Sequence, residues 1–323
     1  MSARPIYFDC DTGVDDALAL AYLIASDKAQ LRGIGTVSGN TDSATAARNT
    51  LDLLQLAGAT NVPVAIGERD FMTRSYDGGA PHVHGANGIG NIVLPKSTTE
   101  PSAESAVDLL LRLAHEAEGK LHLIAVGPLT NIARALEREP RLPELVDGIT
   151  IMGGAAEVPG NITPVAEANI ANDPEAAAAV FAAGWTVTMV PLDVTMTQVL
   201  EAEDRERLAA SGTEFEQALA QMLGHYFEFY REIYGRACCA MHDPLAVAVA
   251  LGDVEITSAP LVRAQVDTTN GPGRGQTICD LRAKYRGYPD QSRANCRPVL
   301  GITGDFPSQL TQLLLEPTAQ VLS

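Results

Sequence analysis

Short apolar runs alternate with amphipathic segments through the first two thirds of this chain, and no other feature constrains its fold as strongly. The expected strands are residues 5–8, 31–37, 63–66, 121–126, 149–152 and 187–192, and the expected helices are residues 15–25, 44–57, 102–117, 129–136 and 174–183. Strands that are apolar throughout and separated by helices indicate a buried, mostly parallel sheet with helices on both faces. The predicted fold is therefore α/β with a Rossmann-like core.

The last third of the chain follows a different pattern. Residues 200–236 and 242–251 have helical patterns, whereas residues 261–266, 277–281 and 298–303 resemble strands. A length of 323 residues suggests about two domains as a soft prior. However, no Pro-, Gly- or Ser-rich linker divides the chain, so we expect one domain over residues 1–323 with a helical and β-rich C-terminal extension.

Charge and cysteine content restrict the partners and the compartment. The chain has 23 basic and 40 acidic residues, a net charge of −17. Such a protein repels nucleic-acid phosphates and anionic lipid, so neither is an expected partner. Five cysteines without a CxxC pair, no recognisable signal peptide and no apolar run of about 18 residues predict a protein of the cytoplasm rather than a secreted or membrane protein.

Four aspartates within eight residues stand where the first expected strand meets the first expected helix: Asp9, Asp11, Asp15 and Asp16. An acid at a helix start commonly caps the helix, which explains one or two of the four. Crowded carboxylates at the mouth of a sheet repel one another, and a bound cation removes that cost. A ligand set made of oxygens, with no His or Cys among the ligands, suits calcium or magnesium.

Two chemistries fit a metal site of this kind. In the first, Asp9 and Asp11 serve a magnesium-dependent phosphatase of the haloacid-dehalogenase type, although Thr12 comes one residue too early for that pattern. In the second, the cation activates water and an aspartate accepts the proton. The pair Asp15-Asp16 has a role only in the second chemistry.

The carboxylate motif and a series of later motifs resemble the inosine-uridine-preferring nucleoside hydrolases. The motifs occur in the family's order between about residues 5 and 281, at 9–16, 37–40, 84–90, 126–131, 152–154, 159–161, 166–169, 173–176, 192–195, 242–244 and 275–277. The resemblance implies a nucleoside-hydrolase-like fold and hydrolysis of the N-glycosidic bond of ribonucleosides to ribose and free base. It also implies a small-molecule ribonucleoside substrate and a homodimer or homotetramer.

The resemblance implies one calcium ion held by the side chains of Asp11, Asp16 and Asp243 and by the backbone carbonyl of Val126. Asp11 would be the general base, since a carboxylate that touches both metal and water suits that role. The chain agrees at Val126, which ends an expected strand directly before Gly127-Pro128. Asp243 alone would more often be read as a helix cap.

The remaining implied site residues bind the two halves of the substrate. Contacts to the ribose hydroxyls are implied for Asp15, Asn40, Asn161, Glu167 and Asn169, and Met152 would pack under the sugar ring. His242 is the implied general acid for the leaving base, because histidine titrates near neutral pH. His84 is a second candidate beside the base. We interpret His82, His115, His122 and His225 as ordinary histidines, and Trp185 as a packing residue.

Base preference stays open at this stage. Relatives usually carry a bulky aromatic residue where this chain has Ala168, which leaves room for a larger or differently placed substrate, and Asn87 replaces a common Asp. The aromatic residues from Tyr226 to Tyr234 form either one wall of the pocket or part of the core.

Two alternatives remain beside hydrolysis of nucleosides. A phosphatase needs a lysine that anchors phosphate, and none of Lys28, Lys96, Lys120 and Lys284 follows an expected strand convincingly. A non-catalytic nucleoside-binding protein has no need of both Asp11 and His242. The sequence therefore favours the hydrolase.

Overall fold

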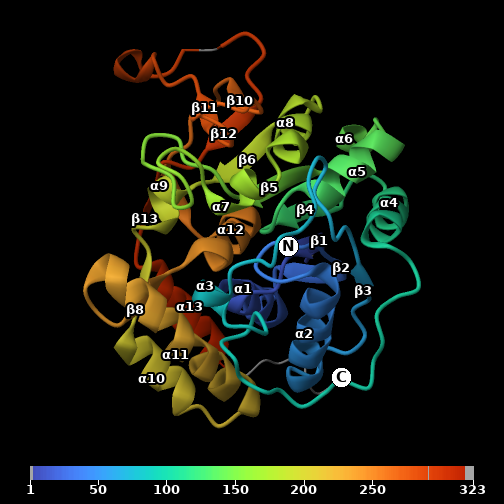
Figure 1. The fold of residues 1–323 in the computed structure, drawn as a ribbon, viewed down its shortest axis with the longest axis vertical. Helices are drawn as coiled ribbons and strands as arrows, with labels where there is room; N and C mark the ends of the chain where they lie inside the picture. The colour runs from blue at the N-terminus through green and yellow to red at the C-terminus, as the bar shows by residue number, and fades with distance from the viewer. Residues whose placement is uncertain (1–2, 290, 317–323) are drawn as a thin grey trace.

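A parallel seven-stranded sheet organises the part of the chain that the computed structural model describes, residues 3–289 and 291–316 (Figure 1). The strand order is β12-β6-β5-β4-β1-β2-β3, and every neighbouring pair is parallel. The strands are β1 (Arg4–Cys10), β2 (Ala29–Thr36), β3 (Val64–Ile66), β4 (His122–Ala125), β5 (Gly148–Met152), β6 (Val187–Val190) and β12 (Cys296–Pro298). The predicted α/β fold is confirmed, and the C-terminal extension supplies the seventh strand.

Helices cover both faces of this sheet because the strands carry apolar side chains on both sides. In β1, Ile6 and Phe8 belong to one buried cluster and Tyr7 to the other. The helices that pack on the first face are α1 (Val14–Ala25), α2 (Ser43–Leu56), α10 (Ala202–Ala209), α11 (Glu214–Tyr234), α12 (His242–Leu251) and α13 (Phe306–Leu315). The helices on the second face are α4 (Ala106–Glu116), α5 (Thr130–Arg138) and α8 (Pro174–Ala182).

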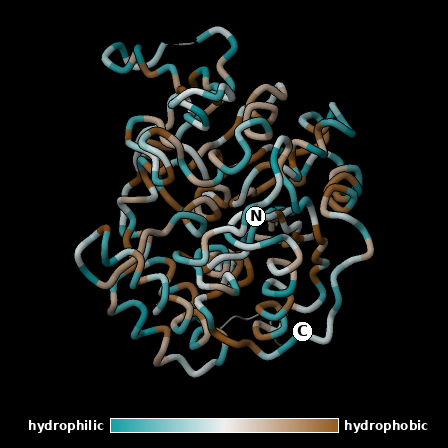
Figure 2. Tube along the Cα trace, in the orientation of Figure 1, coloured by the Kyte–Doolittle hydropathy of each residue, from teal (hydrophilic) through white to brown (hydrophobic). Residues whose placement is uncertain are grey.

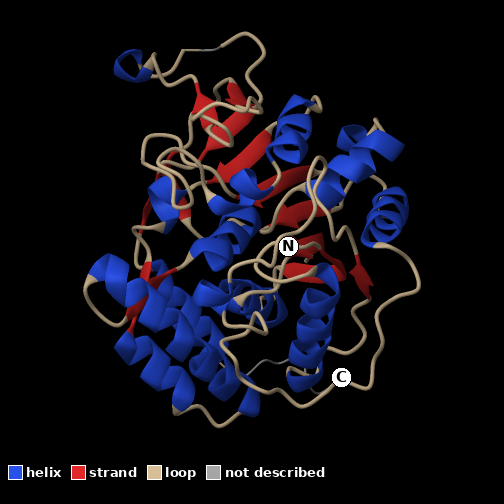
Figure 3. Ribbon diagram, viewed as in Figure 1, coloured by secondary structure: helices blue, strands red, loops and turns tan. Residues whose placement is uncertain are grey.

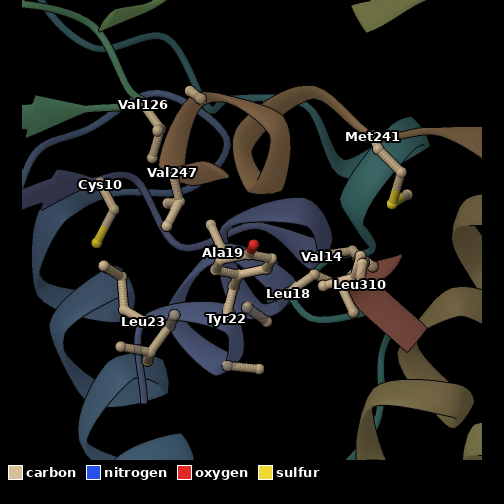
Figure 4. Packing of buried hydrophobic residues seen from close by; sticks show 14 of the residues in the cluster. Cys10, Val14, Leu18, Ala19, Tyr22, Leu23, Val126, Met241, Val247 and Leu310 are labelled. Atoms are coloured by element: carbon tan, nitrogen blue, oxygen red, sulfur yellow. The ribbon is translucent and has the colours of Figure 1, made fainter. Parts of the chain in front are cut away.

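Helix α1 lies at the centre of the first face. Figure 4 shows Leu18 and Tyr22 of α1 among buried side chains that include Val247 of α12 and Leu310 of α13. Hydrophobic segments gather along the strands and the inner helices, whereas hydrophilic segments lie mostly at the periphery (Figure 2). This packing fixes the start of α12 against α1, two elements that are more than 200 residues apart in the chain.

The short elements complete the architecture (Figure 3). They are the helices α3 (Pro81–His84), α6 (Leu142–Leu145), α7 (Ala168–Asn172) and α9 (Leu192–Thr195), the 3-10 turn η1 (Lys284–Arg286), and the strands β7 (Val199–Glu201), β8 (Cys238–Ala240), β9 (Glu255–Ser258), β10 (Ala264–Val266), β11 (Thr277–Cys279) and β13 (Gly301–Thr303). Strand pairs β10-β11, β9-β13 and β7-β8 are antiparallel. Within the described residues, no helix is long and apolar enough to cross a membrane.

Three expectations about element boundaries were wrong. Residues 200–236 form β7, α10 and α11 instead of one helix, because the Thr213 side chain caps a new helix after Ser211-Gly212. Residues 298–303 divide between β12 and β13, since the chain leaves β6 and pairs with β9, where Leu300 N–H donates to the carbonyl of Ser258. Helix α4 begins at Ala106 rather than at residue 102, because Ser105 accepts the N–H of Asp108.

The order of the strands predicts where a ligand binds. From β1, the chain first adds β2 and β3 on one side and then returns to add β4, β5 and β6 on the other. In open α/β sheets, the crevice for ligands lies at the carboxyl ends of the strands where this direction reverses. Here that point lies between β1 and β4, directly before Asp11 and Val126.

Candidate active site

The turn between β1 and α1 is held together by one carboxylate. Gly13 is the N-cap of α1, and Asp16 accepts its backbone N–H at 2.7 Å. The other oxygen of Asp16 accepts the N–H of Asp11 at 3.1 Å. Asp16 thus fixes the backbone of the turn at the mouth of the sheet.

Three carboxylates from two distant parts of the chain converge beside this turn. Asp15, Asp16 and Asp243 each place a ligand atom within 4.8 Å of the others, and all three are buried. Asp243 reaches the cluster because it stands in the first turn of α12, which packs against α1. The structure therefore brings the predicted ligands Asp16 and Asp243 together, and it adds Asp15, which the family resemblance assigned to ribose.

Asp11 lies beside this triad and leaves one oxygen free. Its Oδ2 accepts the N–H of Asn40 at 2.6 Å, whereas its buried Oδ1 has no hydrogen-bond partner among the described residues. The Oδ1 of Asp15 is also buried and unpartnered within the same part of the chain. Orphaned carboxylate oxygens in a buried cluster are costly unless a cation or a donor reaches them.

Electrostatics at the cluster also favour a cation. Burial, followed by repulsion from Asp15, raises the pKa of Asp16 to about 7. Burial and the neighbouring carboxylates raise the pKa values of Asp11 and Asp243 well above their usual range. Without a positive charge, the cluster therefore retains protons near neutral pH. A set of hard oxygen donors with this charge fits a divalent ion such as calcium or magnesium.

A second group of predicted site residues meets at the end of β4. The side-chain amide of Asn169 donates to the carbonyl of Val126 at 2.8 Å and to the carbonyl of Met152 at 3.1 Å. Glu167 caps α7 by accepting the N–H groups of Asn169 and Ile170, and it also accepts the N–H of Gly154. Burial raises the pKa of Glu167 to about 6, although these N–H donors oppose the shift.

The two other predicted ribose ligands are asparagines of loops. Asn40 donates its side-chain amide to Asp16 at 3.1 Å, which ties the loop after β2 to the carboxylate cluster. Asn161 accepts the N–H of Ala168 at 2.9 Å and lines the same cavity as Asn40, although it lies on the exposed rim. All the sequence-predicted ribose ligands therefore border one pocket.

His242 has hydrogen-bond partners on both ring nitrogens. Its Nε2 lies 2.6 Å from the hydroxyl of Tyr230, and its Nδ1 lies 2.8 Å from the hydroxyl of Thr195. Burial lowers the pKa of His242 below its usual value, although the charge of Asp15 opposes that shift. The ring is therefore largely neutral at neutral pH in the absence of a ligand, and its chemistry there is that of an N–H donor.

His84 is also neutral and its hydrogen bonding is fixed. Its Nδ1 accepts the backbone N–H of Val14 at 3.1 Å, so the proton of the neutral ring is on Nε2. Burial lowers the pKa of His84 to about 3. His84 can therefore donate a hydrogen bond, but it does not supply a proton as a charged imidazolium near neutral pH.

Comparison with known proteins identifies this site. Residues 6–306 match the model of a family described as inosine-uridine preferring nucleoside hydrolase. The chain belongs to this family. It is 34% identical to a probable uridine nucleosidase 2 of Arabidopsis thaliana, with 94% of each chain covered. It is 36% identical to the pyrimidine-specific ribonucleoside hydrolase RihA of Photobacterium profundum, with 86% of this chain and 89% of the relative covered.

A solved structure adds a relative that is named for purine instead of pyrimidine nucleosides. A purine-preferring ribonucleoside hydrolase from Gardnerella vaginalis superposes with a TM-score of 0.87 and 32% identity, covering 96% of this chain and 99% of that chain. This protein is thus a nucleoside hydrolase, which cleaves the N-glycosidic bond of ribonucleosides. Enzymes of this family depend on a metal ion, in agreement with the cluster of carboxylates.

The aromatic helix α11 forms one wall of the nucleoside hydrolase pocket. Tyr226, Phe229 and Tyr230 line the cavity, whereas Phe227 packs into the core. The sequence left pocket and core open as alternatives, and the helix serves both, since Tyr226 and Tyr230 also belong to the buried cluster. His82, interpreted as an ordinary histidine, is exposed and also borders the cavity, with its ring centroid 6.0 Å from that of Phe229.

Asp9 is separated from the nucleoside hydrolase pocket by the pleat of β1. Its carboxylate lies 3.2 Å from the hydroxyl of Tyr7 and accepts the amide of Asn131 at 3.0 Å on the opposite face of the sheet. Neighbouring residues of a strand point to opposite faces, so Asp9 shares its side with Tyr7. A phosphatase nucleophile at Asp9 would have no access to the pocket.

Sequence reasoning missed two hydroxyls in contact with His242. Thr195 ends the motif at residues 192–195, and Tyr230 belongs to the aromatic stretch, but neither spacing nor composition pointed to His242. Trp185 was interpreted as a packing residue, and its indole N–H donates to the carbonyl of Val180 within a buried contact.

Proposed function

We propose that this nucleoside hydrolase works with one calcium ion held by Asp11, Asp16, Asp243 and the carbonyl of Val126. The observation that carries the proposal is the convergence of buried carboxylates at the reversal point of the sheet, with unpartnered oxygens on Asp11 and Asp15. Asp15 lies within the same triad and would face both the ion and the ribose. Bound calcium would neutralise these charges and lower the pKa of a water molecule beside them.

Asp11 is the proposed general base. Its Oδ2 is fixed by the N–H of Asn40, which leaves the unpartnered Oδ1 to accept a proton from the attacking water. A base must be positioned within hydrogen-bond reach of the proton it accepts, and its pKa must permit the ionised form. Neutralisation of the cluster would lower the pKa of Asp11 and supply that form.

Ribose would lie across Met152, with its hydroxyl groups toward Asp15, Asn40, Asn161, Glu167 and Asn169. A ribose hydroxyl both donates and accepts, and the proposed ligands combine carboxylate acceptors with amide groups that do both. The burial of Glu167 and Asn169 supports this assignment, because buried polar groups impose strict hydrogen-bond requirements on a ligand.

His242 would assist the departure of the base through Tyr230. Negative charge develops on the leaving base as the glycosidic bond breaks, since the transition state is electron-poor at the sugar. The Nε2 of His242 is bonded to the Tyr230 hydroxyl, and both residues line the pocket. The hydroxyl of Tyr230, polarised by His242, would therefore donate a hydrogen bond to the base, and His84 would add a second neutral donor.

The proposal also extends to the base that the enzyme prefers. Relatives are named for uridine, pyrimidine and purine substrates, so family membership alone does not select one. Ala168 contributes only a methyl group to the pocket wall, and Ile162, which also lines the pocket, is 61% exposed. This open wall supports acceptance of purine as well as pyrimidine ribonucleosides.

We further propose that the enzyme works in the cytoplasm as a homodimer or homotetramer, and that residues 1–323 act as one domain. The thiols of Cys10, Cys238, Cys239, Cys279 and Cys296 are all free, which suits a reducing compartment. Light scattering coupled to size-exclusion chromatography measures the oligomeric state directly.

A nucleoside panel tests the central proposal. Release of ribose would be measured with inosine, adenosine, uridine and cytidine, with added calcium and with a chelator. We expect hydrolysis that a chelator abolishes and calcium restores. Binding of nucleosides without turnover in the presence of calcium would instead indicate a non-catalytic protein, and release of phosphate from p-nitrophenyl phosphate would indicate the phosphatase.

A further inference from the structure

We propose that Thr195 is a positioning residue for the leaving-group machinery: its hydroxyl holds His242 in the form that carries its proton on Nε2, facing Tyr230. The inference rests on the proposed role of His242. It concerns a residue that touches neither the carboxylate cluster nor the pocket, so its effect on catalysis would pass through His242 alone.

The position of Thr195 is fixed by the fold. It ends α9, the short helix that follows β6, and its side chain is completely buried. The backbone N–H of Thr195 donates to the carbonyl of Pro191 at 3.2 Å, and that of Met196 donates to the carbonyl of Leu192 at 3.2 Å. The hydroxyl is therefore presented to the Nδ1 of His242 by a rigid turn.

Counting donors and acceptors assigns the direction of the bond. A neutral imidazole has one N–H donor and one lone-pair acceptor, whereas a hydroxyl has one donor and accepts as well. Among the described residues, the Thr195 hydroxyl has no other hydrogen-bond partner than Nδ1. If Nδ1 carried the proton, the hydroxyl proton of Thr195 would be buried without an acceptor, which is costly.

The favoured arrangement is a directed chain. Thr195 donates to Nδ1, so the ring proton is on Nε2, which donates to the oxygen of Tyr230 at 2.6 Å. The hydroxyl oxygen of Tyr230 is then the acceptor of this bond, so its own proton is not donated to His242 and can be directed into the pocket that Tyr230 lines. If Nδ1 instead donated to Thr195, Nε2 would carry no proton and would have to accept one from Tyr230. Tyr230 would then donate to His242 instead of to the substrate.

The test compares a natural substrate with one whose leaving group needs no hydrogen bond. Inosine has a poor leaving base, whereas 4-nitrophenyl β-D-ribofuranoside releases a stable phenolate. Thr195→Val keeps the shape of the side chain and removes the hydroxyl, and Thr195→Ser keeps the hydroxyl. Thr197→Val is the matched control, because the Thr197 hydroxyl lies near the same turn but bonds the carbonyl of Val194 and the side-chain amide of Gln198 instead of His242.

We expect Thr195→Val to lower kcat/KM for inosine between about 10- and 100-fold, mainly through kcat. This is less than the roughly 10²- to 10⁴-fold that a positioned proton donor contributes. The loss on the nitrophenyl riboside should stay below about threefold, and Thr195→Ser and Thr197→Val should resemble the wild type on both substrates. Activity on the nitrophenyl riboside also reports folding, and Thr195→Ala is the substitute if the valine variant does not fold.

Two results would overturn the proposal while leaving the role of His242 intact. The first is an equal loss on both substrates in Thr195→Val while His242→Ala affects only inosine. The second is a further loss when Thr195→Val is added to His242→Ala, because the effect would then not pass through the ring. A uniform loss on both substrates in His242→Ala itself would overturn the proposed function of His242 as well.

Discussion

The side-chain amide of Asn169 donates a 2.8 Å hydrogen bond to the backbone carbonyl of Val126, and thereby joins a proposed ribose ligand to a proposed metal ligand. The same amide donates to the carbonyl of Met152, so it orients the ends of two neighbouring strands, β4 and β5. Substrate binding and metal binding would therefore be coupled through one side chain.

This contact predicts the outcome of Asn169→Ala. Loss of the amide should raise KM for ribonucleosides and lower kcat/KM about 100-fold, because a ribose contact and the support of the Val126 carbonyl are lost together. Calcium affinity should weaken by roughly 10- to 100-fold, the range typical of residues that orient metal ligands. Steady-state kinetics and calcium titration calorimetry measure the two effects, and an unchanged calcium affinity would show that Val126 needs no support from Asn169.

Removal of the metal should destabilise the protein as well as inactivate it. The proposed calcium ion would bind the folded cluster and would have no comparable site in the unfolded chain, so saturation at 100 times Kd should stabilise folding by about 2.7 kcal/mol. The melting temperature should therefore rise when calcium is added and return to its original value when a chelator is added. Asp243→Asn should reduce the shift, whereas Asp280→Asn, which removes a carboxylate outside the site, serves as the control.

The main features of fold and site follow from local sequence patterns. Apolar runs separated by helices gave the sheet strands β1 to β6, because a strand buried on both faces has no polar positions. The order of residues along the chain also showed that Asp11 and Val126 each follow an expected strand. Their pairing at one metal ion was implied only by the resemblance to the nucleoside hydrolase family.

Contacts between distant residues were beyond this reasoning. The residue pattern by itself does not indicate that α12 packs against α1, and only the family resemblance implied that Asp243 lies near Asp16. The presence of Asp15 in the same triad was not expected. The bonds of His242 to Thr195 and Tyr230 depend on the packing of three helices, and they are equally invisible along the chain. The 200–236 segment was predicted as one helix because its turn at Ser211-Gly212 is only a few residues long.

The close approach of Gly39 to Asp11 shows how tightly the Asp11 carboxylate is confined. A Cβ at this position would overlap the carboxylate of Asp11 and lie 2.8 Å from the Cδ of Pro128. Gly39→Ala should therefore displace the proposed base and reduce turnover at least about 100-fold, since small errors in the position of catalytic groups have effects of this size. Gly212→Ala is the control, because no atom lies within 4 Å of its added Cβ. A folded Gly39→Ala enzyme with normal turnover would contradict the proposed position of Asp11.

The raised pKa of Glu167 predicts that the stability of the metal-free protein depends on pH. Burial raises its pKa from 4.5 to about 6, so the folded protein binds more protons than the unfolded chain between these values. The contribution of Glu167 to the free energy of unfolding must then decrease as pH rises from about 4.5 to 6, and it must be constant above that range. A shift of this size corresponds to about 2 kcal/mol.

Glu167→Gln isolates this contribution, because glutamine keeps the size of the side chain and an oxygen for the backbone N–H donors. The variant should lose the part of the pH dependence that comes from this carboxylate, so wild type and variant should differ more at pH 7 than at pH 4.5. Urea unfolding at both pH values, with a chelator present, measures the difference. Parallel curves of the free energy of unfolding against pH for the two proteins would mean that Glu167 has the same pKa in the folded and unfolded chain. The Glu167 carboxylate would then be solvated, which would contradict its proposed place as a buried ligand of ribose.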